Sequence, residues 1–205
     1  DDCFIGGHPM AGSERVGFIN SRASLLENAY YILTPTASVP GEKVSAYRDL
    51  VAQMGAIPLI LDYRQHDYIT AAISHLPHVI AATLVNLVRE KDSEDGIMKM
   101  IAAGGFKDIT RIASSQAGVW QQICLTNQDN ISSLLSDYIG MLTSFREKLE
   151  QGDPSALYRS FDDARIYRDS FLNASSGPIK RSFCISMEIS DKSGALARIT
   201  ALLAE

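Results

Sequence analysis

Cysteine is scarce in this sequence of 205 residues. The three cysteines, Cys3, Cys124 and Cys184, lie far apart and form no CxxC pair. An odd number of scattered cysteines excludes a disulfide-stapled scaffold and is typical of reduced thiols in a cytoplasmic protein. Basic runs are also missing, because 19 Lys and Arg are outnumbered by 24 Asp and Glu and the net charge is −5. This balance indicates no nucleic-acid partner.

Long hydrophobic runs are missing as well. No stretch reaches the roughly 18 consecutive apolar residues of a membrane span. The longest candidate, residues 69–88, is interrupted by Ser74, His75, Pro77 and His78. No signal peptide precedes the first apolar run, so we expect a cytoplasmic protein with no membrane partner. Both ends of the sequence run into apolar patterns, and we expect the chain to be a piece of a longer protein.

The composition that is present, 46% hydrophobic and 21% charged, excludes a disordered or collagen-like chain. Residues 1–63 alternate short apolar runs with a helical stretch. We expect strands at residues 3–5, 30–33 and 57–61, the first of them ending at Gly6-Gly7. Residues 43–54 have helical spacing and end at Gly55. Strand, helix and strand at these lengths predict part of a parallel α/β sheet.

From about residue 64 the pattern is helical without strands. The expected helices are residues 65–90, 97–103 (stopped by Gly104-Gly105), 131–149 (capped by Asp129 or Asn130) and 153–172. The first of them is apolar nearly all round, which is typical of a helix inside a bundle or between subunits. Pro77 removes one backbone bond within it and favours a kink. Beyond a linker at residues 175–178, residues 182–190 alternate like a strand and residues 194–203 like a helix.

His8 is the first candidate for chemistry. It stands in Gly6-Gly7-His8-Pro9-Met10-Ala11-Gly12-Ser13-Glu14, directly after the first expected strand. Glycines on both sides allow close backbone approach to a ligand, and the carboxyl ends of parallel strands are where α/β proteins bind ligands. Position alone supports a capping or loop histidine equally well.

Polar residues interrupt the apolar helix of residues 65–90. At 100° per residue, Asp67, Ser74 and His78 fall within roughly 20° of one another, and His75 about 80° from Asp67. Such groups are costly to bury unless they are paired or bound. They could line a substrate pocket, form a satisfied polar network, or include a metal site with His75 and His78 at i, i+3. The thiols are remote and no second acidic ligand recurs at helical spacing, so we expect no metal.

Arg111 follows the segment Gly104-Gly105-Phe106-Lys107-Asp108-Ile109-Thr110 that links two expected helices. Its planar guanidinium could clamp a carboxylate with two hydrogen bonds, or it could form an ion pair with a nearby acid. Trp120, the only tryptophan, is more often a core residue than a ligand wall.

Four motifs, in order, resemble those of the prephenate dehydrogenase family over about residues 3–125. They are residues 8–14, residues 30–35, Ser74-His75-Leu76-Pro77-His78, and residues 105–111 with Trp120 beyond them. The family's glycine-rich dinucleotide fingerprint is absent from this sequence. Ser115-Gln116-Ala117 also departs from the family's Ser-Asp-Pro, which affects the local turn rather than the arginine.

The resemblance implies α/β plus all-α architecture: the C-terminal part of a Rossmann-type parallel sheet at residues 1–63, then a helical dimerisation domain at residues 64–176. Residues 181–205, with Asp191-Lys192-Ser193-Gly194-Ala195-Leu196, resemble the first strand and helix of an ACT regulatory domain. Tyrosine is then a possible feedback ligand, and a homodimer through the helical domain is expected.

The implied reaction is oxidative decarboxylation of prephenate to 4-hydroxyphenylpyruvate, in tyrosine biosynthesis, with hydride passing to NAD or NADP. By resemblance, His8 is the general base and Arg111 holds a substrate carboxylate. The resemblance also implies further substrate contacts: His78, Ser74 and His75 line the pocket, Ser13 and Glu14 lie near its mouth, and Trp120 and Asp108 close it at the dimer interface. The cofactor contacts that it implies are Gly7, Pro9 and Pro35.

Two alternatives stay open. Arogenate dehydrogenase performs the same chemistry on a related substrate, and nothing in the sequence separates the two. A noncatalytic helical dimerisation module with a regulatory ligand is the alternative from another class, favoured by the missing fingerprint. A fragment without that fingerprint is expected to be inactive by itself.

Overall fold

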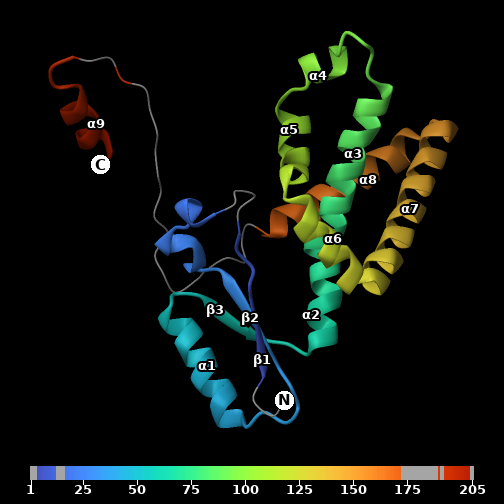
Figure 1. Cartoon of the computed structure of the whole chain (residues 1–205). Coiled ribbons are helices and arrows are strands. Elements are labelled where there is room, and N and C mark those ends of the chain that lie inside the picture. Colours follow the sequence, from blue (N-terminus) through green and yellow to red (C-terminus); the bar gives the residue numbers. More distant parts are fainter. Residues whose placement is uncertain (1–3, 13–16, 172–188, 190–191, 204–205) are drawn as a thin grey trace.

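A computed structural model describes residues 4–12, 17–171, 189 and 192–203. Its sheet has three strands, β1 (Ile5–Pro9), β2 (Tyr30–Pro35) and β3 (Ile57–Ile60), in the order β1-β2-β3 (Figure 1). Strands β2 and β3 are parallel, with Tyr30 opposite Ile57, and helix α1 (Gly41–Gln53) connects them. The parallel strand–helix–strand unit predicted from the sequence is therefore confirmed. Gly55, which has a φ of 81°, ends the helix as expected.

Strand β1 corrects one expectation, because it pairs with β2 antiparallel and His8 lies opposite Ile32. Parallel neighbours need a long crossover, usually a helix. The described part of the connection between β1 and β2 holds only the short 3₁₀ turns η1 (Phe18–Asn20) and η2 (Ala23–Leu26). The strand also begins later than predicted, so His8 lies within it rather than beyond its end.

The two glycines before His8 have a role in packing. A Cβ atom built on Gly6 would collide with the Thr34 hydroxyl of β2. One built on Gly7 would lie 2.5 Å from the Tyr47 hydroxyl of α1. Bare backbone at both positions lets β1 lie close to β2 and α1, over a core of Leu33, Val51 and Ala56. Packing against Tyr47 is therefore an alternative explanation for the glycine at position 7, which the resemblance assigns to cofactor contact.

One continuous helix connects the sheet to the helical half of the molecule. It consists of α2 (Tyr63–Thr70), a π-helical turn η3 (Ala71–His75) and α3 (Leu76–Lys91). Asp62 and Gln65 form a reciprocal capping box at its start. A kink was predicted at Pro77; the turn just before it is widened to a π turn, in which the Leu76 N–H donates to the Ala71 carbonyl. The π turn accommodates the proline, which cannot donate to the Ile73 carbonyl.

The π turn also changes which residues share a face. It inserts one residue into the helical repeat, so later side chains are rotated by roughly 100° from their places on an uninterrupted helix. The predicted sector of Asp67, Ser74 and His78 is therefore split, and only the last two face the same space. This is a correction to the helical-wheel expectation.

The remaining helices are α4 (Ile97–Ile101), α5 (Gly104–Thr110), η4 (Arg111–Ser114), α6 (Ala117–Thr126), α7 (Gln128–Gln151), α8 (Pro154–Ser170) and α9 (Ala195–Leu203). Gly104 and Gly105 open α5 instead of only stopping the preceding helix, which ends at Ile101. The residue before α7 is Asn127, not Asp129 or Asn130, whereas Asp153 caps α8 through the N–H groups of Ser155 and Ala156. The expected linker and nearly all of the strand at residues 182–190 lie outside the described residues, and α9 matches the expected last helix.

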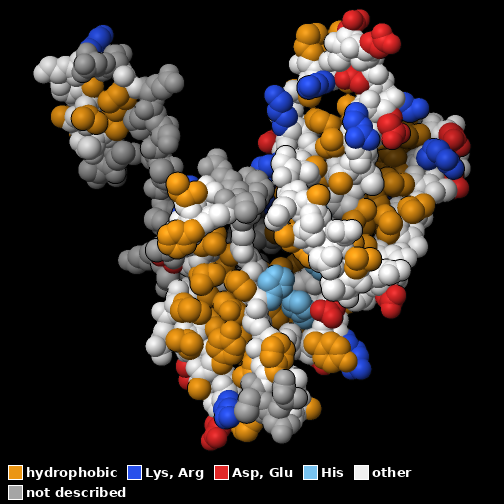
Figure 2. Space-filling view, in the orientation of Figure 1, with side chains coloured by type: hydrophobic (Ala, Val, Ile, Leu, Met, Phe, Trp, Pro, Cys, Tyr) orange, Lys and Arg blue, Asp and Glu red, His pale blue; other side chains and the backbone are white. Residues whose placement is uncertain are grey.

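Large apolar side chains are exposed along the helical half, seen as orange patches in Figure 2. Ile73 is 63% exposed on the long helix, Met141 71% on α7 and Phe161 67% on α8. By length and composition alone, the helix Tyr63–Lys91 could cross a membrane, since an 18-residue window within it has a mean hydropathy of 1.5 despite the polar interruptions. A helix packed against a partner subunit has the same composition.

Candidate functional site

A cavity of about 480 Å³ lies between the end of β1 and the helical half. Binding sites for small molecules are typically of this order of size. The space-filling view shows the histidine side chains, in pale blue, gathered where the sheet half meets the helices (Figure 2). The lining residues are His8, Pro9, Met10, Ala11, Gly12, Ile73, Ser74, His78, Arg111, Ile112, Ser115, Gln116, Val119 and Trp120.

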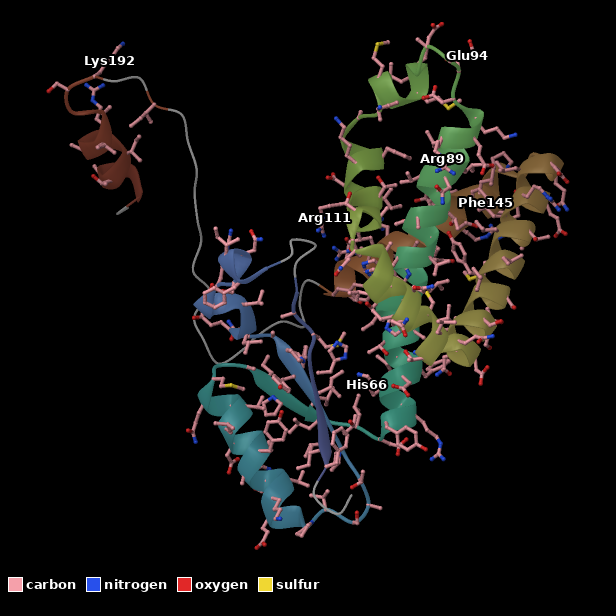
Figure 3. The ribbon with its side chains drawn as sticks, in the orientation of Figure 1. His66, Arg89, Glu94, Arg111, Phe145 and Lys192 are labelled. Carbon is pink, nitrogen blue, oxygen red and sulfur yellow. The ribbon has the colours of Figure 1, made fainter. Side chains whose placement is uncertain are left out.

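His8 is an exposed residue of β1 that borders the cavity and contacts the long helix. Its Nδ1 lies 2.8 Å from Nε2 of His66 on α2, whose own Nδ1 lies 2.8 Å from a carboxylate oxygen of Asp67. Figure 3 shows His66 extending from α2 on the side of the strands. Partial burial lowers the pKa of His8 below its ordinary value of 6.5, and His66 lowers it further. The His8 imidazole is therefore neutral at pH 7 and can accept a proton.

His78 is held on three sides. Its Nδ1–H donates to the Ser74 carbonyl at 2.9 Å, which leaves Nε2 as an acceptor 3.5 Å from the Ser115 hydroxyl. One face of the ring stacks on Trp120, with centroids 3.5 Å apart. Burial lowers the pKa of His78, the bond to Ser74 opposes this, and the positive charge of Arg111 lowers the pKa further. His78 is thus a second neutral imidazole at the cavity wall.

Arg111 begins the turn η4, directly after α5. Figure 3 labels it at the foot of α5, on the side of the helical half that faces the sheet half. Among the described residues that line the cavity, it alone carries a permanent charge. A cavity with one guanidinium and neutral imidazoles suits an anion, because Arg binds carboxylates with two parallel hydrogen bonds.

The structure brings together six of the residues singled out from the sequence, and these line one cavity: His8, Pro9, Ser74, His78, Arg111 and Trp120. Three others lie elsewhere. Asp108 is exposed on α5, Gly7 packs against Tyr47, and Pro35 pairs with Ile5 in the sheet. Ser13 and Glu14 lie outside the described residues.

His75 is also absent from the cavity lining. Its Nδ1 accepts from the Asn127 side chain at 3.2 Å, and its ring meets the edge of Trp120 at 6.0 Å between centroids. Burial lowers its pKa, and the nearby His8, His66 and His78 lower it further, while Asp67 opposes them. Asn127 also donates to the Asp67 carbonyl at 2.7 Å. This part of the predicted polar sector is a satisfied network that ties α2 to the start of α7.

Sequence reasoning gave His66 no role, although it contacts His8, the candidate base. The available signal was the adjacent pair His66-Asp67 in a helix that starts directly after a strand. The contribution of Ser115 and Gln116 to the cavity was also missed, because it depends on the turn before α6. Within the ranges that the structure describes, no group of three or more His, Cys, Asp or Glu is placed to hold a metal ion.

Two family models match most of the chain. The prephenate dehydrogenase nucleotide-binding domain matches residues 1–59, and the prephenate dehydrogenase dimerisation domain matches residues 62–163. The chain belongs to the prephenate dehydrogenase family. The resemblance found in the four sequence motifs is therefore confirmed.

Relatives in the prephenate dehydrogenase family extend beyond this chain. Prephenate dehydrogenase of Bacillus subtilis is 37% identical over 98% of the chain but only 54% of its own length. Cyclohexadienyl dehydrogenase of Zymomonas mobilis is 33% identical over 80% of the chain and 56% of its own length. The chain thus spans about half the length of the curated relatives it matches.

Solved structures give the same fold. Prephenate dehydrogenase of Aquifex aeolicus, in complex with hydroxyphenyl propionate and NAD+, has a TM-score of 0.77 and 29% identity over 82% of this chain and 59% of its own. Synechocystis arogenate dehydrogenase has a TM-score of 0.73 and 27% identity over 82% of this chain and 61% of its own.

Proposed function

We propose that this chain carries the substrate site of an NAD(P)-dependent prephenate dehydrogenase, which converts prephenate to 4-hydroxyphenylpyruvate and carbon dioxide in tyrosine biosynthesis. The observation that carries the proposal is that a neutral imidazole, His8, and a permanent cation, Arg111, border one cavity. A dianionic substrate with a ring hydroxyl needs both a base and a positive charge.

The chemistry balances with these residues alone plus one hydride acceptor. The hydroxyl proton of the ring moves to Nε2 of His8 as hydride leaves the same ring carbon. The carboxylate on the opposite ring carbon then leaves as carbon dioxide, and its bonding electrons aromatise the ring. The phenolate oxygen regains a proton. Arg111 holds a substrate carboxylate throughout, and Ser74, His78 and Trp120 shape the cavity.

The described residues fit the reacting end of a nicotinamide cofactor, since His8 and Pro9 border open space. A nicotinamide bound there supplies the hydride acceptor. The glycine-rich loop that would cradle the phosphates is absent from this sequence. We therefore assign only the nicotinamide end to these residues, with Pro9 at the cavity, and we retain Gly7 and Pro35 as more distant candidates.

Further parts of the proposal rest on other features. The exposed apolar side chains of α3, α7 and α8 support a homodimer through the helical domain, here taken as residues 64–176, after a sheet domain of residues 1–63. We retain the proposed substrate roles of His75, Asp108, Ser13 and Glu14. We also propose a cytoplasmic location, and tyrosine as a feedback ligand of residues 181–205.

Arogenate is the second candidate substrate, favoured by the match to the Synechocystis arogenate dehydrogenase. The deciding experiment supplies prephenate and arogenate separately, with NAD+ or NADP+, to a full-length dehydrogenase that carries this sequence. Release of carbon dioxide, together with 4-hydroxyphenylpyruvate or tyrosine as product, identifies the substrate. Release from neither substrate, with the fold intact by circular dichroism, contradicts the proposal and favours a noncatalytic module.

A further inference from the structure

His8, His66 and Asp67 are linked in series by two short hydrogen bonds, which lead away from the cavity. The first joins Nδ1 of His8 to Nε2 of His66, and the second joins Nδ1 of His66 to Oδ1 of Asp67, both at 2.8 Å. The two imidazole rings meet edge to face, with centroids 5.1 Å apart and planes inclined by 67°. His66 does not line the cavity, and only 19% of its side chain is exposed.

Hydrogen bonds to the backbone of helix α2 hold His66 and Asp67 in place. The carbonyl of His66 accepts from the Thr70 hydroxyl at 2.8 Å, and the carbonyl of Asp67 accepts from Asn127 at 2.7 Å. The capping box of Asp62 and Gln65 fixes the turn that precedes them. His66 and Asp67 are therefore anchored on α2, whereas His8 reaches them from a different element, β1.

The positions of the protons follow from which atoms can donate. An ionised carboxylate only accepts, so Asp67 requires the proton on Nδ1 of His66. A neutral His66 then has a lone pair on Nε2, which requires the proton on Nδ1 of His8. Nε2 of His8 is left with its lone pair. Because Nδ1 faces His66, Nε2 is the nitrogen available to the cavity that His8 lines.

We propose that His66 and Asp67 are positioning residues that hold His8 in the Nδ1–H tautomer, with the basic Nε2 directed to the cavity. Free imidazole side chains favour the opposite tautomer, in which Nε2 carries the proton and cannot act as a base. Asp67 also offsets the positive charge that His8 gains when it takes a proton. The catalytic consequence rests on the proposed function, but the tautomer itself does not.

The first experiment needs no substrate. Nitrogen-15 labelling of the histidines in this chain distinguishes protonated from unprotonated ring nitrogens by chemical shift. The expected spectrum at neutral pH has Nδ1 protonated and Nε2 unprotonated in His8, and likewise in His66. A His8 that is protonated on Nε2 overturns the proposal.

The decisive variant is Asp67→Leu, which keeps the side-chain size but removes the acceptor. His66 should then place its proton on Nε2 and donate to His8, whose own proton moves to Nε2. The matched control is Asp137→Leu, an exposed carboxylate on α7 that makes the same change in charge. An unchanged His8 tautomer in a folded Asp67→Leu chain overturns the proposal. Should that variant fail to fold, His66→Phe removes the same acceptor for His8 and must give the same loss of the Nδ1–H form.

Turnover provides the second readout. In a full-length dehydrogenase, Asp67→Leu should lower kcat about 10²- to 10⁴-fold, as expected for a base in the wrong tautomer, and leave the KM for the substrate nearly unchanged. A structural role alone would change thermal stability without this split. Other titratable or charged groups also influence the pH profile. His66 and Asp67 on α2 are linked to His8 by hydrogen bonds, the charge of His8 affects His75 on η3, and His78 on α3 and Arg111 on η4 line the same cavity as His8.

The two proposals fail in different ways. If the Nδ1–H tautomer of His8 depends on Asp67 but turnover does not need His8, the positioning role is supported and His8 is not the base. Turnover that needs His8 but is insensitive to Asp67→Leu removes the positioning role and leaves the proposed function standing.

Discussion

The imidazole of His78 lies flat on the indole of Trp120, with centroids 3.5 Å apart and planes inclined by 20°. His78 comes from the helix after the π turn and Trp120 from α6, so the stack joins two elements across the cavity wall. The indole shields one face of the imidazole from water. Burial is the largest cause of the lowered pKa of His78, and the stack contributes to that burial.

Replacing Trp120 tests this shielding. Trp120→Ala should raise the pKa of His78 toward its ordinary value, because water reaches the exposed face of the ring. Trp120→Phe should preserve most of the lowered value, since a smaller aromatic ring can still stack. A nuclear magnetic resonance titration of the His78 ring protons measures both. Equal pKa values in the wild type and in Trp120→Ala would show that the stack does not contribute.

His8→Asn tests the proposed base. Asparagine can still hydrogen-bond the substrate hydroxyl but cannot take its proton at neutral pH. In a full-length dehydrogenase, turnover should fall about 10²- to 10⁴-fold while substrate affinity stays nearly unchanged. The wild-type pH profile should also show a group that must be deprotonated, and this group should be missing from the variant. Unchanged turnover would leave His8 with a structural role only.

Arg111→Ala should raise KM much more than it lowers kcat, because a carboxylate clamp acts on the ground state and the transition state alike. Charged hydrogen bonds contribute roughly 1.5–3 kcal/mol each, so binding should weaken about tenfold to a few hundredfold. Arg111→Lys should recover part of this. NAD+ affinity should stay constant.

A second effect of the same substitution is independent of the substrate. Because Arg111 lowers the pKa of His78, that pKa should rise in Arg111→Ala. A variant that melts early yet binds substrate normally would instead identify Arg111 as a structural ion-pair partner.

Sedimentation tests the proposed dimer. We expect a stable dimer at micromolar concentration, since apolar side chains such as Met141 and Phe161 are exposed on adjacent helices. Met141→Glu should weaken the dimer by introducing a charge into this surface. Gln53→Glu, which adds the same charge on α1 in the sheet half, is the control and should have no effect. A monomeric wild-type chain would contradict the prediction.

Stability should fall as the solution becomes acidic. The pKa values of His8, His75 and His78 are all lower in the fold than the ordinary 6.5, mainly because of burial. Below about pH 6.5 the unfolded chain therefore binds more protons than the folded one, and stability is lost until the pH passes below the folded pKa values. Well above pH 6.5 the three histidines are neutral in both states and do not make the free energy of unfolding depend on pH.

Urea unfolding midpoints at about pH 7.5 and about pH 5.5 measure this dependence on pH. Both pH values lie well above the range in which carboxyl groups titrate. The change between the two should be smaller in His75→Gln, because one of the three titrating rings is removed. A midpoint that does not move between these values would show that the histidines are as easily protonated in the fold as in the unfolded chain.

Several features of this protein were determined by local sequence. The 3.6-residue spacing from Ile131 to Leu149 predicted one helix, and the pattern of residues 153–172 predicted the next, because helical spacing depends only on residues a few positions away. The family motifs also made His8 and Arg111 candidate site residues, and the two line one cavity although they lie 103 positions apart in the numbering of the chain.

Tertiary structure decided the rest. The direction of β1 depended on the connection that follows it, and Gly7 is explained by Tyr47 on a distant helix. The π turn before Pro77 separated Asp67 from Ser74 and His78, which a regular helical wheel places together. The contact between His8 and His66 joins residues 58 positions apart. No local pattern could show it, because its geometry is set by how β1 packs against α2, and that packing is the sum of many contacts along the whole chain.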